Sequence, residues 1–172
     1  VTLSVNHTLA KPGEVRLTAN HLTYISESHK KMVDDICFSL RSGEVLGVVG
    51  VEGNGQKELV DMLTGEKEPY SGTIQISGAS IKGKNIRDIR DLSVGYIPQE
   101  RMETGVAQDS TITENIASYI YQNPDYQSGP LLSWNKLAKT AQQLISEYQI
   151  KAESEETVVR MLSGGNIQKV VV

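Results

Sequence analysis

An apolar run, a glycine-rich loop and a helical pattern follow one another between residues 45 and 65, and this succession constrains the fold most. The run "VLGVVG", Val45–Gly50, predicts a strand buried on both faces, as in a parallel or mixed sheet. Gln56–Gly65 carries apolar residues at helical spacing and ends on a glycine, which predicts a helix. The N–H groups of a glycine loop and the positive end of a helix dipole both attract anions. The unit therefore predicts a phosphate-binding site.

The glycines of this loop follow a phosphate-loop pattern, but the reactive side chains do not. Gly50 and Gly55 have the spacing of G-x-x-x-x-G-K-[ST], with Gln56 at the lysine position and Lys57 at the hydroxyl position. Successive helix residues point about 100° apart, so Lys57 faces the place of the Mg²⁺ that a hydroxyl would bind, and repels it. Glu58 adds negative charge near the phosphates. We expect a loop that binds phosphate through its backbone and lacks the groups for hydrolysis.

Composition limits the class of protein. A net charge of −4 argues against a nucleic acid as the main partner, because nucleic-acid binders usually carry a basic surface. The single cysteine, Cys37, excludes an intrachain disulfide framework and suits a reducing compartment. No apolar run approaches the roughly 18 residues that a membrane span needs. His7, His21 and His29 have no metal-ligand spacing, so we predict surface histidines and no metal site.

The periodicity of the sequence changes after Asp109. Alternation predicts strands near residues 15–24, 32–40, 72–77 and 93–98, in addition to the strand at 45–50. Helical spacing follows, most clearly over Trp134–Ile150. We therefore expect an N-terminal linker over 1–14, a core with the glycine loop over 15–108, and a helical subdomain over 109–172.

A second glycine element, "LSGGN", starts 112 residues after Gly50. Ser163 is suited to cap the helix that follows, and the N–H groups of Gly164 and Gly165 are suited to receive an anion. Either glycine element alone could be an ordinary turn. Two anion-receptive elements in one small chain favour a nucleotide-related function.

These motifs together resemble those of ABC-transporter ATPases over nearly the whole chain. "LSGGN-Q-K" resembles the signature motif in the form typical of sugar and nucleoside importers, and "GYIPQER", Gly95–Arg101, looks like the Q-loop. "GVEGNGQKEL" is similar to the altered P-loop in the second ATPase domain of fused two-domain subunits, closer to the nucleoside or basic-membrane-protein type than to the ribose type. The resemblance implies an α/β fold: a P-loop NTPase-like core with an antiparallel β-rich part and a helical subdomain, incomplete at its C-terminus.

The resemblance also implies roles for particular residues. In the family, each nucleotide is shared between the P-loop of one domain and the signature of its partner. The residues implied in nucleotide binding are Tyr24, Gly50, Gly53, Asn54, Gly55, Gln56, Lys57, Glu58 and Gln99. The signature residues, which would act in trans, are Leu162, Ser163, Gly164, Gly165 and Asn166. Tyr24 has the place of an adenine-stacking residue, although a tyrosine that merely covers the sheet is as good a reading. We expect Arg101 and Glu103 to form a solvated loop face.

The family's catalytic strand is not found in the sequence. No string of four apolar residues followed by Asp-Glu occurs, and no switch histidine follows the signature. The general base and the Asp that organises Mg²⁺ are therefore absent from these 172 residues, and we expect no catalytic residue and no hydrolysis by the chain alone. The unusual residues at both ends, Val1 and Val172, suggest a piece of a longer polypeptide.

The expected ligand is ATP, bound weakly, with Mg²⁺ only in a complete transporter. The expected partners are a companion ATPase domain and membrane permease subunits, reached through the region after the Q-loop, at the cytoplasmic side of the membrane. Two alternatives stay open: a nucleic-acid-associated ABC ATPase, which would usually separate its motifs by long insertions, and a non-catalytic module that binds nucleotide or dimerises.

Overall fold

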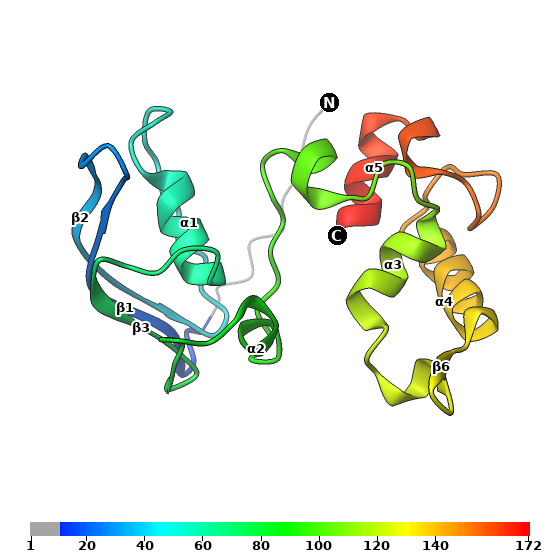
Figure 1. Ribbon diagram of the computed structural model, residues 1–172, viewed down its shortest axis with the longest axis horizontal. Coiled ribbons are helices and arrows are strands. Elements are labelled where there is room, and N and C mark those ends of the chain that lie inside the picture. The colour runs from blue at the N-terminus through cyan, green and yellow to red at the C-terminus, as the bar shows by residue number, and fades with distance from the viewer. Residues whose placement is uncertain (1–10) are drawn as a thin grey trace. The chain divides into compact units, whose positions relative to one another are not determined.

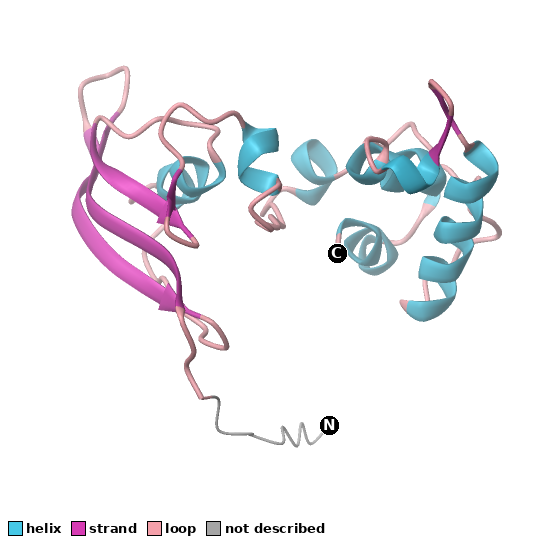
Figure 2. Ribbon diagram, turned by 90° about the horizontal axis from the view of Figure 1, so that it is seen from below, coloured by secondary structure: helices cyan, strands magenta, loops and turns pink. Residues whose placement is uncertain are grey.

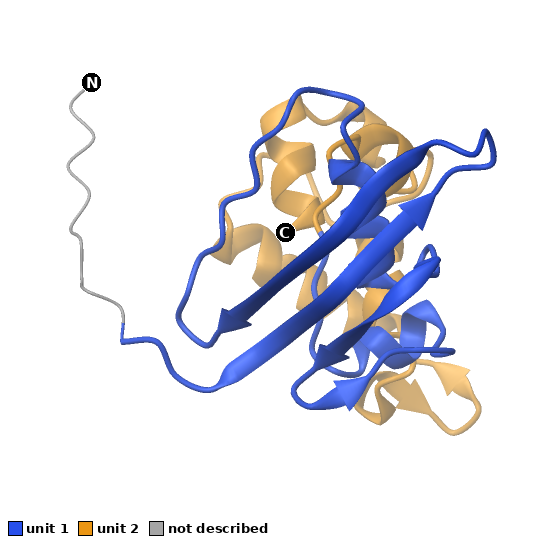
Figure 3. Cartoon of the chain, turned by 90° about the vertical axis from the view of Figure 1, so that its left-hand side faces the viewer, with its two compact units in different colours: residues 1–96 blue, residues 97–172 orange. Residues whose placement is uncertain are grey.

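The computed structural model describes residues 11–172, and the chain divides between Tyr96 and Ile97 into two compact units (Figure 3). His7 and most of the linker expected over 1–14 lie outside the described residues. Each unit has its own apolar core. The boundary between the compact units precedes the boundary expected at 108, which follows the change in periodicity after Asp109. The assignment of the nucleotide-binding core and the signature-bearing subdomain to the two parts stays a prediction.

The first unit is built on a four-stranded antiparallel sheet in the order β2-β1-β3-β4 (Figure 1). Its strands are β1 (Val15–Ile25), β2 (Lys31–Arg41), β3 (Ser71–Ile76) and β4 (Ala79–Ser80). The three strands expected near 15–24, 32–40 and 72–77 are confirmed, because alternating apolar residues bury one face of the sheet.

Helix α1 (Gln56–Thr64) supplies the apolar surface that this sheet face needs. Its Leu59 and Met62 join Leu22 and Val33 of the sheet in one core. The short helix α2 (Ile86–Arg90) adds Ile89 to the same core. Gly65, at φ 82°, ends α1 in the left-handed conformation, so the predicted helix and its glycine stop are confirmed.

Two predicted strands are wrong. Residues 44–50 have no regular structure, and Val45 and Val49 are 95% and 98% exposed instead of buried. Leu92–Pro98 contains no strand either. A strand buried on both faces needs neighbours that pair with its edges and layers that cover its faces. Within residues 11–172, no strand pairs with either segment.

The second unit is helical, apart from the hairpin of β5 (Gln127–Ser128) and β6 (Leu131–Leu132) (Figure 2). Its helices are η1 (Arg101–Gly105), α3 (Ile112–Ile120), η2 (Pro124–Tyr126), α4 (Trp134–Glu147), η3 (Val159–Met161) and α5 (Gly164–Val171). Ile112, Val159 and Ile167 bring α3, η3 and α5 into one core. The helical pattern predicted from residue 134 is confirmed by α4.

Candidate functional site

The glycine loop ends against the backbone of β2. Gly55 precedes α1 with φ 93°, in the left-handed region that favours glycine. A Cβ added at Gly55 would overlap the carbonyl oxygen of Met32, so the close approach also requires glycine. The N–H of Leu59 donates to the carbonyl of Gly55 at 2.8 Å, which starts the helix directly at the loop. The start of α1 is thereby fixed on the sheet, with its first N–H groups directed into the loop.

The side chain of Gln56 folds back across this loop. Its Nε2 donates to the carbonyl oxygen of Val51 at 3.1 Å. A Cβ at Gly50 would overlap the Gln56 amide, so the amide lies directly against the first glycine of the loop. A phosphate entering the loop would have to displace this amide or accept a hydrogen bond from it.

Lys57 directs its ammonium to a carboxylate one turn along α1. Its Nζ lies 3.0 Å from Oδ2 and 3.3 Å from Oδ1 of Asp61, whose side chain is 2% exposed. The Nζ of Lys67 lies 3.0 Å from the same Oδ2, so two ammonium groups compensate one buried carboxylate. The hydrogen bond to Asp61 raises the pKa of Lys57, which therefore stays charged. The spacing of Lys57 and Asp61, four residues on a helix, could have predicted this pair from the sequence.

Tyr24 is connected to the same group of charges. Its half-buried ring lies 5.1 Å, from the ring centroid, from the Nζ of Lys67, a cation–π distance. Tyr96, also near these charges, has a raised pKa, mainly because burial disfavours its charged form. Lys67 thus joins β1 to α1, and adenine stacking by Tyr24 stays a prediction.

In the second unit, Gln99 is exposed in a loop just before η1. Arg101, two residues later, is not merely a solvated loop residue: it is half-buried, and its Nη1 donates to Oε1 of Gln168 at 2.9 Å and to the carbonyl of Gly164 at 3.5 Å. The expectation for Arg101 is therefore wrong, because a planar guanidinium with several donors bridges two acceptors on α5. Glu103 is exposed, as expected.

The predicted signature, Leu162–Asn166, leads from the end of η3 into the first turn of α5. Ser163 is the N-cap residue, but its hydroxyl makes no cap bond to the backbone; instead, Nδ2 of Asn166 donates to Oγ of Ser163 at 2.9 Å. Oδ1 of Asn166 accepts from the N–H of Lys151 at 3.0 Å, so Asn166 is fixed from both sides. A Cβ added at Gly164 or Gly165 would meet nothing within 4 Å. These glycines leave open space at the positive end of a helix, beside an exposed hydroxyl.

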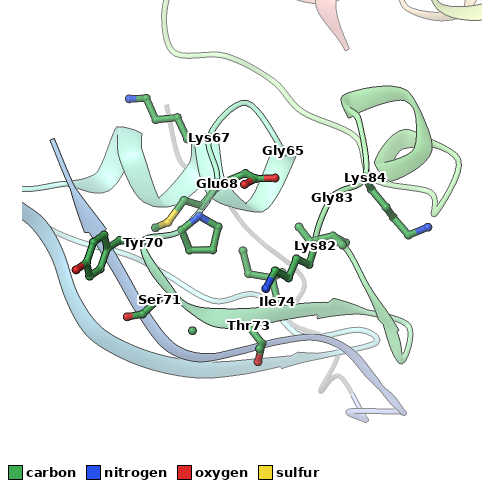
Figure 4. A pocket seen from close by; sticks show the side chains of 14 residues that line it. Gly65, Lys67, Glu68, Tyr70, Ser71, Thr73, Ile74, Lys82, Gly83 and Lys84 are labelled. Carbon is green, nitrogen blue, oxygen red and sulfur yellow. The ribbon is translucent and has the colours of Figure 1, made fainter. Parts of the chain in front are cut away.

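A cavity of about 240 Å³ in the first unit lies apart from the predicted nucleotide-binding residues. Figure 4 shows Tyr70 and Lys84 at opposite ends of its lining, with Ile74 on β3 between them. Lys67, Lys82 and Lys84 all line it, but so does Glu68, and none of the residues expected to bind nucleotide does. The sequence did not predict this cavity, because the residues that line it are brought together only by the packing of α1 on β3.

Comparison with known proteins identifies the family. The sequence profile of the ABC transporter family matches residues 33–172, most of the chain. The chain belongs to this family. The fold agrees: the chain superposes on cbiO1 from Clostridium perfringens, part of the ABC transporter complex cbiONQ, with a TM-score of 0.69 at 19% identity, covering 92% of this chain and 59% of that chain. It also superposes on the ATP-binding cassette MJ0796, bound to ADP and Pi, with a TM-score of 0.71 at 16% identity, covering 90% and 66%. The predicted fold, mixed α/β with an antiparallel sheet and helices, is confirmed.

Similar curated proteins are named as import ATP-binding proteins. The guanosine import ATP-binding protein NupO of Bacillus subtilis is 35% identical over 172 residues, which are all of this chain and 34% of that protein. The nucleoside import ATP-binding protein NupA of Lactococcus lactis is 33% identical, over 95% of this chain and 32% of that protein. A galactose/methyl galactoside import ATP-binding protein of Photobacterium profundum is 32% identical, over 94% and 31%. The chain spans about a third of the length of these relatives. No helix in residues 11–172 has the length and apolarity to span a membrane.

Proposed function

We propose that this chain is part of the ATP-binding subunit of an importer, with a degenerate P-loop and a working signature that completes the ATP site of a companion domain. The proposal rests on a difference between the N-termini of α1 and α5. At the start of α1, the Gln56 amide lies across the loop and the Lys57 ammonium is held by Asp61. At the start of α5, by contrast, Gly164 and Gly165 face open space.

The signature residues suit the terminal phosphate of ATP held by another domain. An anion at the start of α5 would meet glycine N–H groups, the Ser163 hydroxyl and the positive end of the helix dipole. Such fixed donors stabilise charge that develops during phosphoryl transfer, and they need no metal of their own. Bound ATP would supply the phosphoryl group, and this chain would only hold its terminal phosphate.

The loop of this chain fits Mg²⁺ poorly, because the position of the metal-binding hydroxyl holds Lys57. ATP would therefore bind weakly at Gly50–Glu58, while Mg²⁺ belongs to the site of the companion domain. We place this chain second in a fused two-domain polypeptide, because the altered P-loop "GNGQ" sits beside a complete "LSGGN" in one sequence.

We infer a nucleoside-like or sugar-like solute from the names of the similar proteins, NupO and NupA among them. The companion domain and the membrane permease subunits would be its partners, with the segment after Gln99 as the region that meets the permease. The complex would place this chain at the cytoplasmic side of the membrane.

The test is ATP turnover and solute uptake by the reconstituted full-length transporter. Ser163→Arg should abolish both, because a long cation at the start of α5 fills the space that the phosphate needs. Gln56→Ala is the matched control on the other glycine element and should change turnover little. If Gln56→Ala is the damaging change and Ser163→Arg is silent, the roles of the two elements are reversed and the proposal fails.

A further inference from the structure

A histidine, an aspartate and a cysteine lie close together on β1 and β2, and none of them is among the residues implied in nucleotide binding. Nδ1 of His21 lies 2.7 Å from Oδ1 of Asp35, and the backbone N–H of His21 donates to Sγ of Cys37 at 3.1 Å. One ligand atom from each of the three side chains lies within 4.8 Å of the other two, and all three residues are exposed. The spacing along the chain gives no sign of this cluster, because two neighbouring strands bring the residues together.

Two β-bulges build the cluster. Between the pairs Ala19–Phe38 and Leu22–Ile36, β1 has two residues, Asn20 and His21, opposite Cys37 alone. One step further, between Leu22–Ile36 and Tyr24–Val33, β2 has two residues, Asp34 and Asp35, opposite Thr23 alone. Bulges of this kind redirect side chains out of the regular alternation of a strand. The bulges here lie on opposite strands, and each contributes one member of the cluster.

The backbone at both bulges is strained and supported by its neighbours. His21 and Asp35 have φ values of 52° and 53°, in the left-handed region that non-glycine residues rarely occupy. The N–H of Asp35 donates to Oγ1 of Thr23 at 3.2 Å. On the other side of β1, a Cβ at Gly72 would overlap the carbonyl of His21, so β3 accommodates the bulge with a glycine. Strain of this kind persists where the surrounding structure holds it, and it concentrates at functional sites.

We propose that His21, Asp35 and Cys37 bind a divalent metal ion, with Zn²⁺ as the best match and water as the fourth ligand. Imidazole nitrogen, carboxylate oxygen and thiolate sulfur are the ligands that Zn²⁺ takes in proteins. The ion would lie between Nδ1 of His21 and Oδ1 of Asp35, and the neutral imidazole would carry its proton on Nε2. Two ligands about 2.1 Å from a tetrahedral Zn²⁺ lie about 3.4 Å apart, so these atoms separate slightly while the sulfur moves inward.

The charges balance on binding. Asp35 brings one negative charge, neutral His21 brings a lone pair, and Cys37 becomes a thiolate by releasing its proton to solvent. The site thus neutralises a 2+ ion. The His21 N–H donated to Sγ would remain as a hydrogen bond to the metal-bound thiolate, the kind of outer contact that orients ligands at metal sites.

Cobalt(II) provides the direct test, because a Co²⁺–thiolate bond gives a charge-transfer absorption in the near ultraviolet. The untagged 172-residue chain is titrated with CoCl₂, and the bound Co²⁺ is then displaced with ZnCl₂. We expect a charge-transfer band that saturates at one Co²⁺ per chain and disappears with Zn²⁺. Cys37→Ser should abolish the band. His21→Gln or Asp35→Asn should weaken Co²⁺ binding by at least about tenfold, because losing even a residue that only hydrogen-bonds to a metal ligand weakens metal binding by about that factor.

Matched controls lie in the same hairpin. His29 is an exposed histidine with φ 63°, and Asp34 is an exposed aspartate paired with Lys31 at 3.0 Å. His29→Gln and Asp34→Asn should leave Co²⁺ binding unchanged. A second readout uses Cys37 as the single cysteine of the chain: Zn²⁺ should slow its alkylation by iodoacetamide, and EDTA should restore the rate.

The proposal is overturned if no saturable charge-transfer band forms, or if the control variants reduce it as much as the ligand variants do. It is also overturned if Zn²⁺ leaves alkylation of Cys37 unchanged while circular dichroism shows a folded chain. These measurements use no nucleotide, so their outcome is independent of the proposed role in an importer.

Discussion

At the scale of single residues, Gln56 and Lys57 at the start of α1 each have a partner within the chain. The amide of Gln56 closes the loop on the carbonyl of Val51, and Lys57 serves Asp61. Removing the lysine at 57 would leave Asp61 with Lys67 as its partner, so the buried carboxylate stays compensated. The loop can therefore be changed chemically without exposing an unpaired charge in the core.

We predict that Gln56→Lys with Lys57→Ser strengthens binding of Mg·ATP. A hydrogen bond to a charged group is worth about 1.5–3 kcal/mol, which corresponds to roughly 10- to 150-fold in Kd. Isothermal titration calorimetry of the purified chain measures the gain. Lys57→Ser alone is the control and should gain less, because it restores the hydroxyl without the cation. Equal affinity of the double variant and the parent chain would show that Gly50–Gly55 is not a phosphate cradle.

At the scale of secondary-structure elements, both glycine elements lie at helix N-termini, and the helices of the chain differ in how their N-termini are capped. Helix α3 begins with a complete capping box: the N–H of Glu114 donates to Oγ1 of Thr111 at 3.1 Å, and the N–H of Thr111 donates to Oε2 of Glu114 at 2.8 Å. Ser133, at the start of α4, makes no cap bond with its side chain. The cap of α3 fixes the helix that packs against the signature-bearing part of the unit.

We predict that Thr111→Ala lowers the free energy of unfolding of the second unit by about 1 kcal/mol, the usual cost of losing an N-cap. Trp134 is the single tryptophan of the chain and lies in this unit, so urea unfolding followed by its fluorescence reports on it. Ser133→Ala is the matched control and should have a smaller effect. The prediction is wrong if both substitutions cost the same.

The same cap has a pH dependence with a definite sign. The hydrogen bond from the Thr111 backbone lowers the pKa of Glu114 in the folded chain. A lowered pKa contributes stability above the unfolded value of about 4.3, and this contribution is lost as pH falls through the folded value. The stability difference between the parent chain and Glu114→Gln should therefore shrink under acid conditions, when both are unfolded with urea at neutral and at low pH.

At the scale of the whole molecule, the chain has the fold of the ABC transporter family and spans about a third of the length of similar curated proteins. Neither an apolar strand ending in Asp-Glu nor a histidine after the signature occurs in the 172 residues. The expectation that these residues supply neither the general base nor the carboxylate that organises Mg²⁺ stays a prediction.

We predict that the purified chain alone gives no steady ATP turnover in a coupled phosphate-release assay. Gln99→Ala is the control, because Gln99 would contact Mg²⁺ or the attacking water in an active site of this family. Turnover that the parent chain sustains and Gln99→Ala abolishes would contradict the prediction. It would mean that other groups of this chain carry out catalysis.

The sequence by itself determined the elements whose signals are local. β1, β2, β3, α1 and α4 were predicted because alternation or helical spacing is a property of consecutive residues. The family was also implied by three short motifs, each contiguous in the chain.

The tertiary structure decided whatever depends on a distant partner. Val45–Gly50 reads as a buried strand, but pairing partners decide whether a strand forms, and the segment is exposed. Arg101 reads as a loop residue until Gln168 is seen 2.9 Å away on α5. The cluster of His21, Asp35 and Cys37 depends on the register of β1 against β2 and on two bulges. Registers and bulges are fixed by interactions between strands, so the spacing of residues within one strand does not reveal them.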